Sequence, residues 1–267
     1  MTIHHADAHA KIKLVLAVTG SRDDGYHTLR SVFLRLALRD RRSVQLDASA
    51  RADHLTIDGE LDASDDNRVL RAASHVRAAL DPSLPALRFT LRKRIPAAAG
   101  LGGGSSDAAA AIDLALAAWG VRLHPAERLE AALQLGADVP FFAAGHAAAL
   151  VEGIGEHIVP LPAPGPPAGL VLVTPCERLS TAAVFAEYDR VAQAISPAEE
   201  RTDEVAALLR ERVDGMTLAA ITPMLREGND LWAPAVRLSP DLLSARDAAS
   251  RILGRPLLLT GSGPTLV

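Results

Sequence analysis

A cluster of glycines directly ahead of an alanine-rich segment constrains this chain more than any other feature. Four of the five residues from Gly100 to Gly104 are glycine, Ser105 and Ser106 follow, and 108–119 has the composition of a strong helix former. The glycines let the backbone turn at positive φ and bring bare N–H groups close to a ligand. The unpaired N–H groups and positive dipole end of the helix would lie at the same place. The segment therefore predicts an anion site, most naturally for phosphate.

Two common nucleotide-binding patterns do not fit this loop. It lacks the lysine of the GxxxxGK phosphate loop, and Ser105 stands where the dinucleotide-binding GxGxxG pattern needs its last glycine. The hydroxyls of Ser105 and Ser106 could donate to phosphoryl oxygens or support a cation. A flexible turn followed by a serine N-cap stays open as the alternative.

The composition excludes several classes of protein. A chain of 267 residues with 49% hydrophobic and 22% charged residues is typical of one or two globular domains. A net charge of −4 gives no basic field for nucleic acid or anionic lipid. Apolar runs fall far short of the ~18 residues of a membrane span, and the start of the chain lacks a signal-peptide pattern. We therefore expect a cytoplasmic protein without nucleic-acid or membrane partners, and both a monomer and a homodimer stay open.

The single cysteine and the histidines near the start carry no predicted chemistry. Cys176 cannot form an intrachain disulfide, and we expect it to be a small buried residue. His5 and His9 have a spacing of four but lie close to the chain start, where we expect no metal site.

Hydrophobic periodicity predicts a mixed α+β fold. In the first half we expect strands at 10–18, 43–47, 54–58 and 87–95, an apolar segment at 29–38, and helices at 69–80, 108–119 and 125–136. The Pro/Gly-rich stretch 161–169 predicts a linker, which divides the chain into domains 1–160 and 161–267. In the second half we expect strands at 170–174 and 257–259, helices at 181–190, 202–213, 217–227 and 240–253, and a second glycine-rich turn at 260–265.

An aspartate and a lysine are the candidate reactive groups. Asp138 follows the predicted helix end at Gly136 and lies among apolar residues. It could act as a general base or orient a substrate hydroxyl, although a capping or turn aspartate stays open. Lys11 and Lys13 are two residues apart on a predicted strand and should share a face. Beside a phosphate site Lys11 could stabilise a transferred group, and lysines that protect an edge strand are the alternative.

The few aromatic residues include a candidate base-binding pair. Tyr26 and His27 follow Asp24 and Gly25 in a predicted loop. An exposed tyrosine can stack on a base while a histidine hydrogen-bonds the base edge, although a core tyrosine stays open. Phe185, between Val184 and Ala186, is expected in the core.

Taken together, these motifs resemble the GHMP small-molecule kinases, and the resemblance spans nearly the whole chain. The glycine segment Pro96–Ala109 resembles their phosphate loop. Within that class, further motifs resemble the kinases that act on cytidine diphosphate methylerythritol, and these are Ala10–Ile12, Asp24–His27, Leu135–Phe142, Glu152–Glu156, Asn229–Leu231 and Leu259–Gly263.

The resemblance implies an enzyme that uses ATP to phosphorylate the 2-hydroxyl of this substrate to the 2-phosphate, in the non-mevalonate isoprenoid pathway. It implies an N-terminal domain like ribosomal-protein S5 domain 2, a ferredoxin-like C-terminal domain, and an active site in the cleft between them. Lys11 and Asp138 would be the catalytic pair, and Asp138 would also contact the substrate.

The resemblance also implies the binding residues. The ATP phosphates would be held by Pro96, Ala97, Ala98, Ala99, Gly100, Leu101, Gly102, Gly103, Gly104, Ser105 and Ser106, with Asn67 towards the adenosine. Tyr26, His27 and Phe185 would recognise cytosine, and Thr260, Gly261, Ser262 and Gly263 would close the site. Mg²⁺ is expected with ATP, with Ser106 as the one candidate protein ligand.

Two departures from the family pattern affect these expectations. Lys13 stands where the family has an asparagine near the substrate's polyol, and it adds charge there. The chain stops at Val267, where the family runs on through its last strand, so either the sequence is truncated or the terminal strand is curtailed. A kinase for homoserine, mevalonate or a sugar, and a non-catalytic nucleotide-binding sensor, are the rival interpretations.

Overall fold

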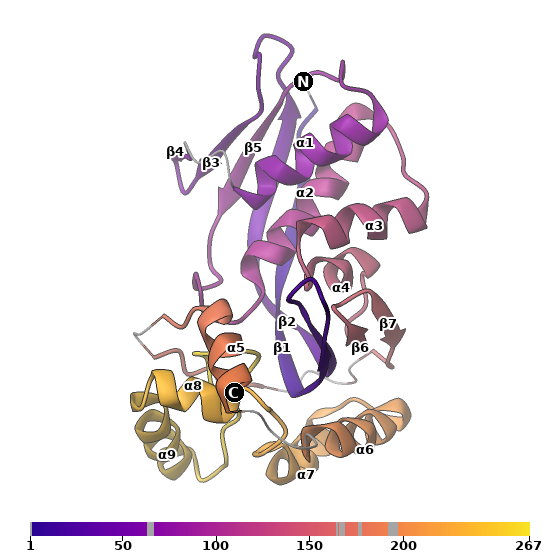
Figure 1. Ribbon diagram of the computed structural model, residues 1–267. Coiled ribbons are helices and arrows are strands. Elements are labelled where there is room, and N and C mark those ends of the chain that lie inside the picture. The colour runs from indigo at the N-terminus through magenta and orange to yellow at the C-terminus, as the bar shows by residue number, and fades with distance from the viewer. Residues whose placement is uncertain (1, 63–66, 164, 166–168, 176–177, 192–196) are drawn as a thin grey trace. The chain divides into compact units, whose positions relative to one another are not determined.

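The computed structural model describes residues 2–62, 67–163, 165, 169–175, 178–191 and 197–267, so Cys176 and part of the predicted linker lie outside the described residues. The chain forms two compact units (Figure 1). The first unit comprises Met1–Ala10, Leu36–Ala97 and Gly102–Gly145, and the second comprises Lys11–Arg35, Ala98–Leu101 and His146–Val267. Strands β1 (His4–Ser21) and β2 (His27–Leu46) each contribute residues to both units. The division into functional domains at residue 160 stays a prediction.

The first unit contains a sheet with clear period-two alternation. Its strands are the C-terminal part of β2, β5 (Leu87–Arg92), β3 (His54–Ile57) and β4 (Glu60–Asp62). β5 runs antiparallel to β2, with Phe89 opposite Val44, and parallel to β3. Leu87, Phe89 and Leu91 are buried while the residues between them are exposed, as the sequence predicted.

The helices of the first unit lie beside these strands in Figure 1. They are α1 (Arg68–Leu80), α2 (Gly103–Trp119), α3 (Pro125–Leu135) and α4 (Val139–Ala144). Asn67 caps α1 by accepting the N–H of Val69 at 2.9 Å, and Pro125 begins α3. The apolar faces of α1 and α2 form one core with β5, in which Val76, Phe89 and Ile112 are fully buried. These elements support the N-terminus of α2, which begins inside the glycine cluster.

The second unit combines further strands of the same sheet with helices. The N-terminal part of β2 pairs antiparallel with β6 (Ala148–Gly153), which pairs with β7 (His157–Pro160). The helices are α5 (Thr181–Arg190), α6 (Pro197–Glu211), α7 (Gly215–Leu225), α8 (Trp232–Leu238) and α9 (Asp241–Leu253). A core around Leu16, Val184, Leu231 and Leu259 joins β1 to α5, α8 and the glycine turn near the C-terminus.

Several element boundaries differ from the prediction. β1 and β2 are longer than expected because each continues through both units. The expected strands at 170–174 and 257–259 are reduced to single bridges, in which Val173 and Leu259 each pair with Leu266. α6 and α7 each begin before the expected residue and end two residues early.

Candidate active site

Helix α2 begins inside the glycine cluster. Its N-cap is Gly102, at φ +70°, so Gly103 and Gly104 are helical and Ser105 and Ser106 lie in the first turn. The expected helix start at 108 and the alternative of a serine N-cap are therefore both wrong. Among the described residues no side chain caps this helix. Its first N–H groups form a donor set that suits a phosphate oxygen.

A positively charged side chain, that of Arg68, lies beside the start of α2 within the first unit. Arg68, the first residue of α1, donates from Nη1 to Ser105 Oγ at 3.1 Å. The same Nη1 is 3.6 Å from the position that a Cβ on Gly104 would occupy. Arg68 directly follows the cap residue Asn67, and it was not among the predicted site residues. The guanidinium adds positive charge at the end of α2 that already favours an anion.

A cluster of four buried or half-buried charges lies at the two ends of the glycine loop. It consists of Asp40 and Arg42 on β2, Lys93 just after β5, and Asp107 in α2. Lys93 Nζ donates to Asp40 Oδ2 at 2.5 Å and to Asp107 Oδ2 at 2.9 Å. Arg42 pairs with the Asp107 carboxylate and also donates to its backbone carbonyl. We name these four residues the charge cluster.

The charge cluster holds both ends of the glycine loop. On the entry side, Asp40 Oδ1 accepts the backbone N–H of Arg94 at 2.5 Å and of Ile95 at 2.9 Å. On the exit side, Asp107 lies in the first turns of α2. Lys93 bridges the two carboxylates, so the chain before the loop is tied to the helix after it.

Burial and hydrogen bonding set the protonation of the charge cluster. Burial alone would raise the pKa of Asp40, but hydrogen bonds from Lys93 and from two backbone N–H groups outweigh it and hold that pKa below its ordinary value. Burial raises the pKa of Asp107 despite its two cationic neighbours. Burial lowers the pKa of Arg42 to about 10, so the guanidinium keeps its charge at neutral pH.

Lys11 contacts the start of the glycine loop within the second unit. Its Nζ donates to Gly100 O at 2.9 Å, and its backbone N–H donates to Leu101 O at 2.9 Å. The residue is only 2% exposed, so the alternative of a solvent-facing edge lysine is wrong. Lys13 shares its face, because both ammonium groups lie over the Phe33 ring, at 5.5 and 4.8 Å from its centroid.

The second glycine turn packs against the same segment. The backbone N–H of Lys13 donates to Thr260 Oγ1 at 2.7 Å, and Ser262 Oγ is 2.9 Å from the hydroxyl of Thr181. Asn229 Nδ2 donates to the carbonyl oxygens of Leu259 and Gly261, at 2.9 and 2.8 Å. Residues 260–263 are therefore held next to Lys11 by side chains that are distant in sequence.

The contact between the two glycine segments depends on Gly100. A Cβ at this position would lie 2.7 Å from Gly263 O, and the backbone φ is +75°. Gly120 has a similar φ of +69°, but among the described residues nothing lies within 4 Å of its Cβ position.

We expect Gly100→Ala to lower the free energy of unfolding by about 2–3 kcal/mol, because backbone strain adds to a steric clash. The matched Gly120→Ala variant carries only the strain and should lose about 1 kcal/mol. Urea unfolding of both variants measures the difference. Equal losses would show that the approach of Gly100 to Gly263 is not tight.

The predicted base-binding residues lie near an aromatic cluster in the second unit. Tyr26 is 59% exposed, so the alternative of a core tyrosine is wrong. The His27 ring stacks on Phe185 with centroids 4.8 Å apart, and the Tyr188 ring meets it edge-on at 6.0 Å. His27 Nε2 lies 2.7 Å from Asp189 Oδ1. Phe185 also packs against the second core, as expected. Tyr188 and Asp189 were not among the predicted site residues.

Asp138 stands at the N-cap position of α4 and is half-buried. In the described structure its side chain makes no capping hydrogen bond, so the capping alternative is wrong, whereas Asp138 does lie in a turn, as the other alternative expected. Asp138 belongs to the first unit and Lys11 to the second.

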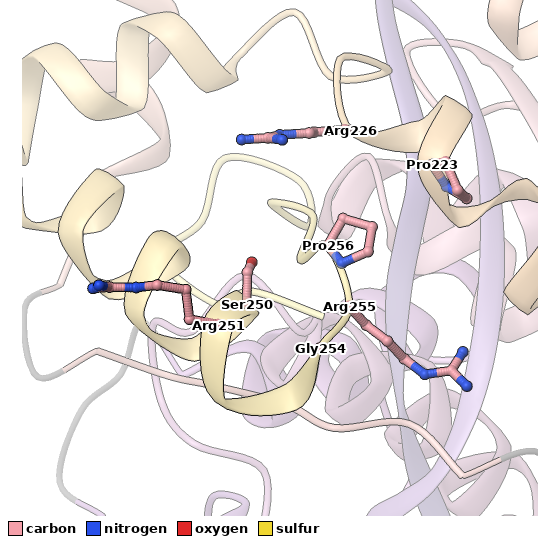
Figure 2. Close-up of a pocket in the computed structure, with 7 residues that line it drawn as sticks. All are labelled: Pro223, Arg226, Ser250, Arg251, Gly254, Arg255 and Pro256. Carbon is pink, nitrogen blue, oxygen red and sulfur yellow. The ribbon is translucent and has the colours of Figure 1, made fainter.

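The described residues hold no further candidate site. No three His, Cys, Asp or Glu side chains gather there as a metal site, and none of the described helices has the length and apolarity to cross a membrane. A surface hollow of about 470 Å³ is lined by Pro223, Arg226, Ser250, Arg251, Gly254, Arg255 and Pro256. Figure 2 shows the guanidinium of Arg255 pointing away from those of Arg226 and Arg251. The three cations therefore do not converge on one ligand.

The family model for the N-terminal domain of GHMP kinases matches residues 67–146, which include α1, the glycine loop and Asp138. This match and the α+β architecture define the class as a GHMP-type small-molecule kinase. Two curated proteins named 4-diphosphocytidyl-2-C-methyl-D-erythritol kinase are similar over nearly the whole chain. The protein from Gluconacetobacter diazotrophicus is 37% identical over 98% of this chain and 85% of its own, and that from Symbiobacterium thermophilum is 39% identical over 98% and 88%. The chain therefore belongs to the 4-diphosphocytidyl-2-C-methyl-D-erythritol kinase family.

A solved structure agrees with this assignment. The crystal structure of a 4-(cytidine 5'-diphospho)-2C-methyl-D-erythritol kinase is similar with a TM-score of 0.72 and 32% identity. The match covers 98% of this chain and 88% of that one. The GHMP kinase fold with mixed helices and sheet is thus confirmed.

Proposed function

We propose that this chain transfers the γ-phosphoryl group of ATP to the 2-hydroxyl of 4-diphosphocytidyl-2-C-methyl-D-erythritol, which gives the 2-phosphate in the non-mevalonate isoprenoid pathway. Membership of the kinase family supports this activity. The observation that carries it is the contact of Lys11 Nζ with Gly100 O, at 2.9 Å, which places a buried amine on the glycine loop.

The resemblance supports a finer division of the fold. It assigns 1–160 to a domain like ribosomal-protein S5 domain 2 and 161–267 to a ferredoxin-like domain, with the active site in the cleft between them. The catalytic pair then takes Lys11 and Asp138 from segments that are far apart in the chain.

ATP is the proposed phosphoryl donor, and residues 96–106 are its proposed phosphate site. The uncapped N-terminus of α2, with Arg68 beside Ser105, has the donor groups that a polyphosphate needs. Asn67 would lie towards the adenosine. Mg²⁺ would arrive with ATP and neutralise phosphate charge when bound, and Ser106 is the candidate protein ligand.

Phosphoryl transfer depends on placement and charge stabilisation more than on covalent chemistry. We assign Asp138 to accept the proton of the 2-hydroxyl, or to orient that hydroxyl, as its oxygen attacks. We assign Lys11 to neutralise negative charge on the attacking oxygen and on the transferred group.

Recognition of the cytosine is assigned to three residues of the second unit. The exposed Tyr26 and the half-buried Phe185 offer faces on which a base can stack, and His27 offers a hydrogen-bonding edge. The turn Thr260–Gly263 is assigned to the rest of the substrate.

An ADP-release assay over a panel of acceptors tests the proposed function. With ATP and Mg²⁺ we expect ADP release with the cytidine substrate and little with mevalonate, homoserine or a sugar. If the protein preferred one of those acceptors, that acceptor would replace the cytidine compound as the proposed substrate. ATP binding without ADP release on any acceptor would favour a nucleotide-binding sensor.

A further inference from the structure

The ring of His27 is fixed in orientation by two aromatic neighbours. Phe185 stacks on it with an interplanar angle of 23°, and Tyr188 meets it at 90°. The side chain is only 11% exposed. Stacking on one face and an edge contact elsewhere leave the ring few orientations, so each nitrogen has a defined direction.

Asp189 determines which ring nitrogen carries the hydrogen. Its Oδ1 lies 2.7 Å from Nε2 of His27, and an ionised carboxylate can only accept a hydrogen bond. Nε2 must therefore carry the hydrogen, and in the neutral ring Nδ1 is left with a lone pair. In the part of the chain that the structure describes, Nδ1 has no hydrogen-bond partner.

We infer that Asp189 is a positioning residue for base selection, because it makes Nδ1 of His27 a hydrogen-bond acceptor that favours cytosine over uracil. This inference rests on the proposed function. The exocyclic N4 amino group of cytosine donates hydrogen bonds, whereas the O4 of uracil at the same position only accepts. Nδ1 can accept a hydrogen bond from the N4 amino group of cytosine. Opposite the O4 of uracil, Nδ1 faces a second acceptor, and no hydrogen bond forms.

The expected discrimination follows from the cost of an unpaired polar group. Two facing acceptors lose one hydrogen bond and leave both groups desolvated, which corresponds to a preference on the order of tenfold to hundredfold. Without Asp189 the neutral imidazole can also place its hydrogen on Nδ1, and that form donates to a carbonyl. Removing the carboxylate should therefore relax the choice of base and leave the choice of phosphoryl donor unchanged.

The test compares Asp189→Leu with Asp203→Leu. Asp203 is a matched control because it is 57% exposed, against 58% for Asp189, and also pairs with a side chain of β2, Arg30. The readouts are kcat/KM for the cytidine substrate and for its uridine counterpart, the KM for ATP, and the His27 tautomer from long-range ¹H–¹⁵N NMR correlations.

We expect the cytidine-to-uridine ratio of kcat/KM to fall on the order of tenfold or more in Asp189→Leu and to stay unchanged in Asp203→Leu. The KM for ATP should be unchanged in both. In the unsubstituted protein the spectrum should show the hydrogen on Nε2, and in Asp189→Leu a mixture of tautomers.

Two results would overturn the inference. One is an unchanged base preference in Asp189→Leu. The other is a spectrum of the unsubstituted protein with the hydrogen on Nδ1, a measurement that needs no variant to fold. If the unsubstituted protein does not phosphorylate the cytidine substrate, the proposed function fails, and the NMR experiment still decides whether Asp189 sets the tautomer.

Discussion

Asp138→Ala is expected to lower kcat by about 10²–10⁴-fold, with a much smaller change in the KM for ATP. The carboxylate is assigned to the hydroxyl that attacks, whereas ATP is assigned to the loop and the first turn of α2. Asp113→Ala is a suitable control, because Asp113 is an exposed aspartate of α2 whose partner is Arg128. Steady-state kinetics with ATP and the cytidine substrate varied separately would measure both parameters. Near-normal turnover would refute the role of Asp138.

Lys11→Ala should give a rate loss of the same order. Its amine is assigned to the charge that develops during transfer, and it also holds the carbonyl of Gly100. Pre-steady-state measurement of the chemical step separates the two effects, because a disturbed loop alone would weaken ATP binding and leave the rate at saturating ATP intact.

Elements with a local signal could be predicted from the sequence. The alternation from Leu87 to Leu91 requires only that one face of a strand is buried. Asn67 caps α1, and Pro125 and Gly136 bound α3, because these residue types stabilise a helix end through their own side chain or backbone. The same local chemistry pointed to the glycine loop as an anion site.

Other elements could not be predicted because their signal is not local. Ala148–Val151 in β6 is buried at every position, so it shows no alternation. The start of α2 depends on the left-handed backbone of Gly102, and a run of glycines suits several starting points equally. The short α4 has only six residues, and the side chain of its N-cap residue Asp138 makes no capping hydrogen bond.

The site residues also divide into those with a local sequence signal and those whose contacts are distant in the sequence. Lys11, His27 and Gly100 could be proposed from motifs, but their partners lie far away in the sequence. Lys11 bonds Gly100 across 89 positions, and His27 meets Asp189 across 162. Such contacts depend on how the elements pack, which a single sequence does not reveal.

The charge cluster is the clearest residue set that sequence reasoning missed. Asp40 and Arg42 lie in the polar stretch Arg39–Arg42 of β2, whose composition suggests a solvated strand. Both are buried in the structure, because Lys93 and Asp107 supply partners from two other elements. Charged residues are rarely fully buried unless they are paired in this way.

Asp40→Asn is accordingly expected to lower the free energy of unfolding by about 3 kcal/mol at neutral pH, the lower end of the range for a broken buried pair. The lower end applies because Lys93 is partly exposed and keeps Asp107 as a partner. Asp113→Asn removes an exposed pair of the same unit and should cost less than about 1 kcal/mol. Urea unfolding of the two variants gives both values.

The pH dependence of that difference identifies the charge as its cause. The pKa of Asp40 is lowered in the folded state from an ordinary value of 3.8, so its stabilisation is complete above that pH and is lost as the pH falls through the folded value. The gap between the unsubstituted protein and Asp40→Asn should therefore stay constant from pH 7 to about pH 5 and shrink below about pH 4. A gap that is the same at every pH would mean that the substitution acts through packing, and that the ionised carboxylate does not hold the entry to the glycine loop.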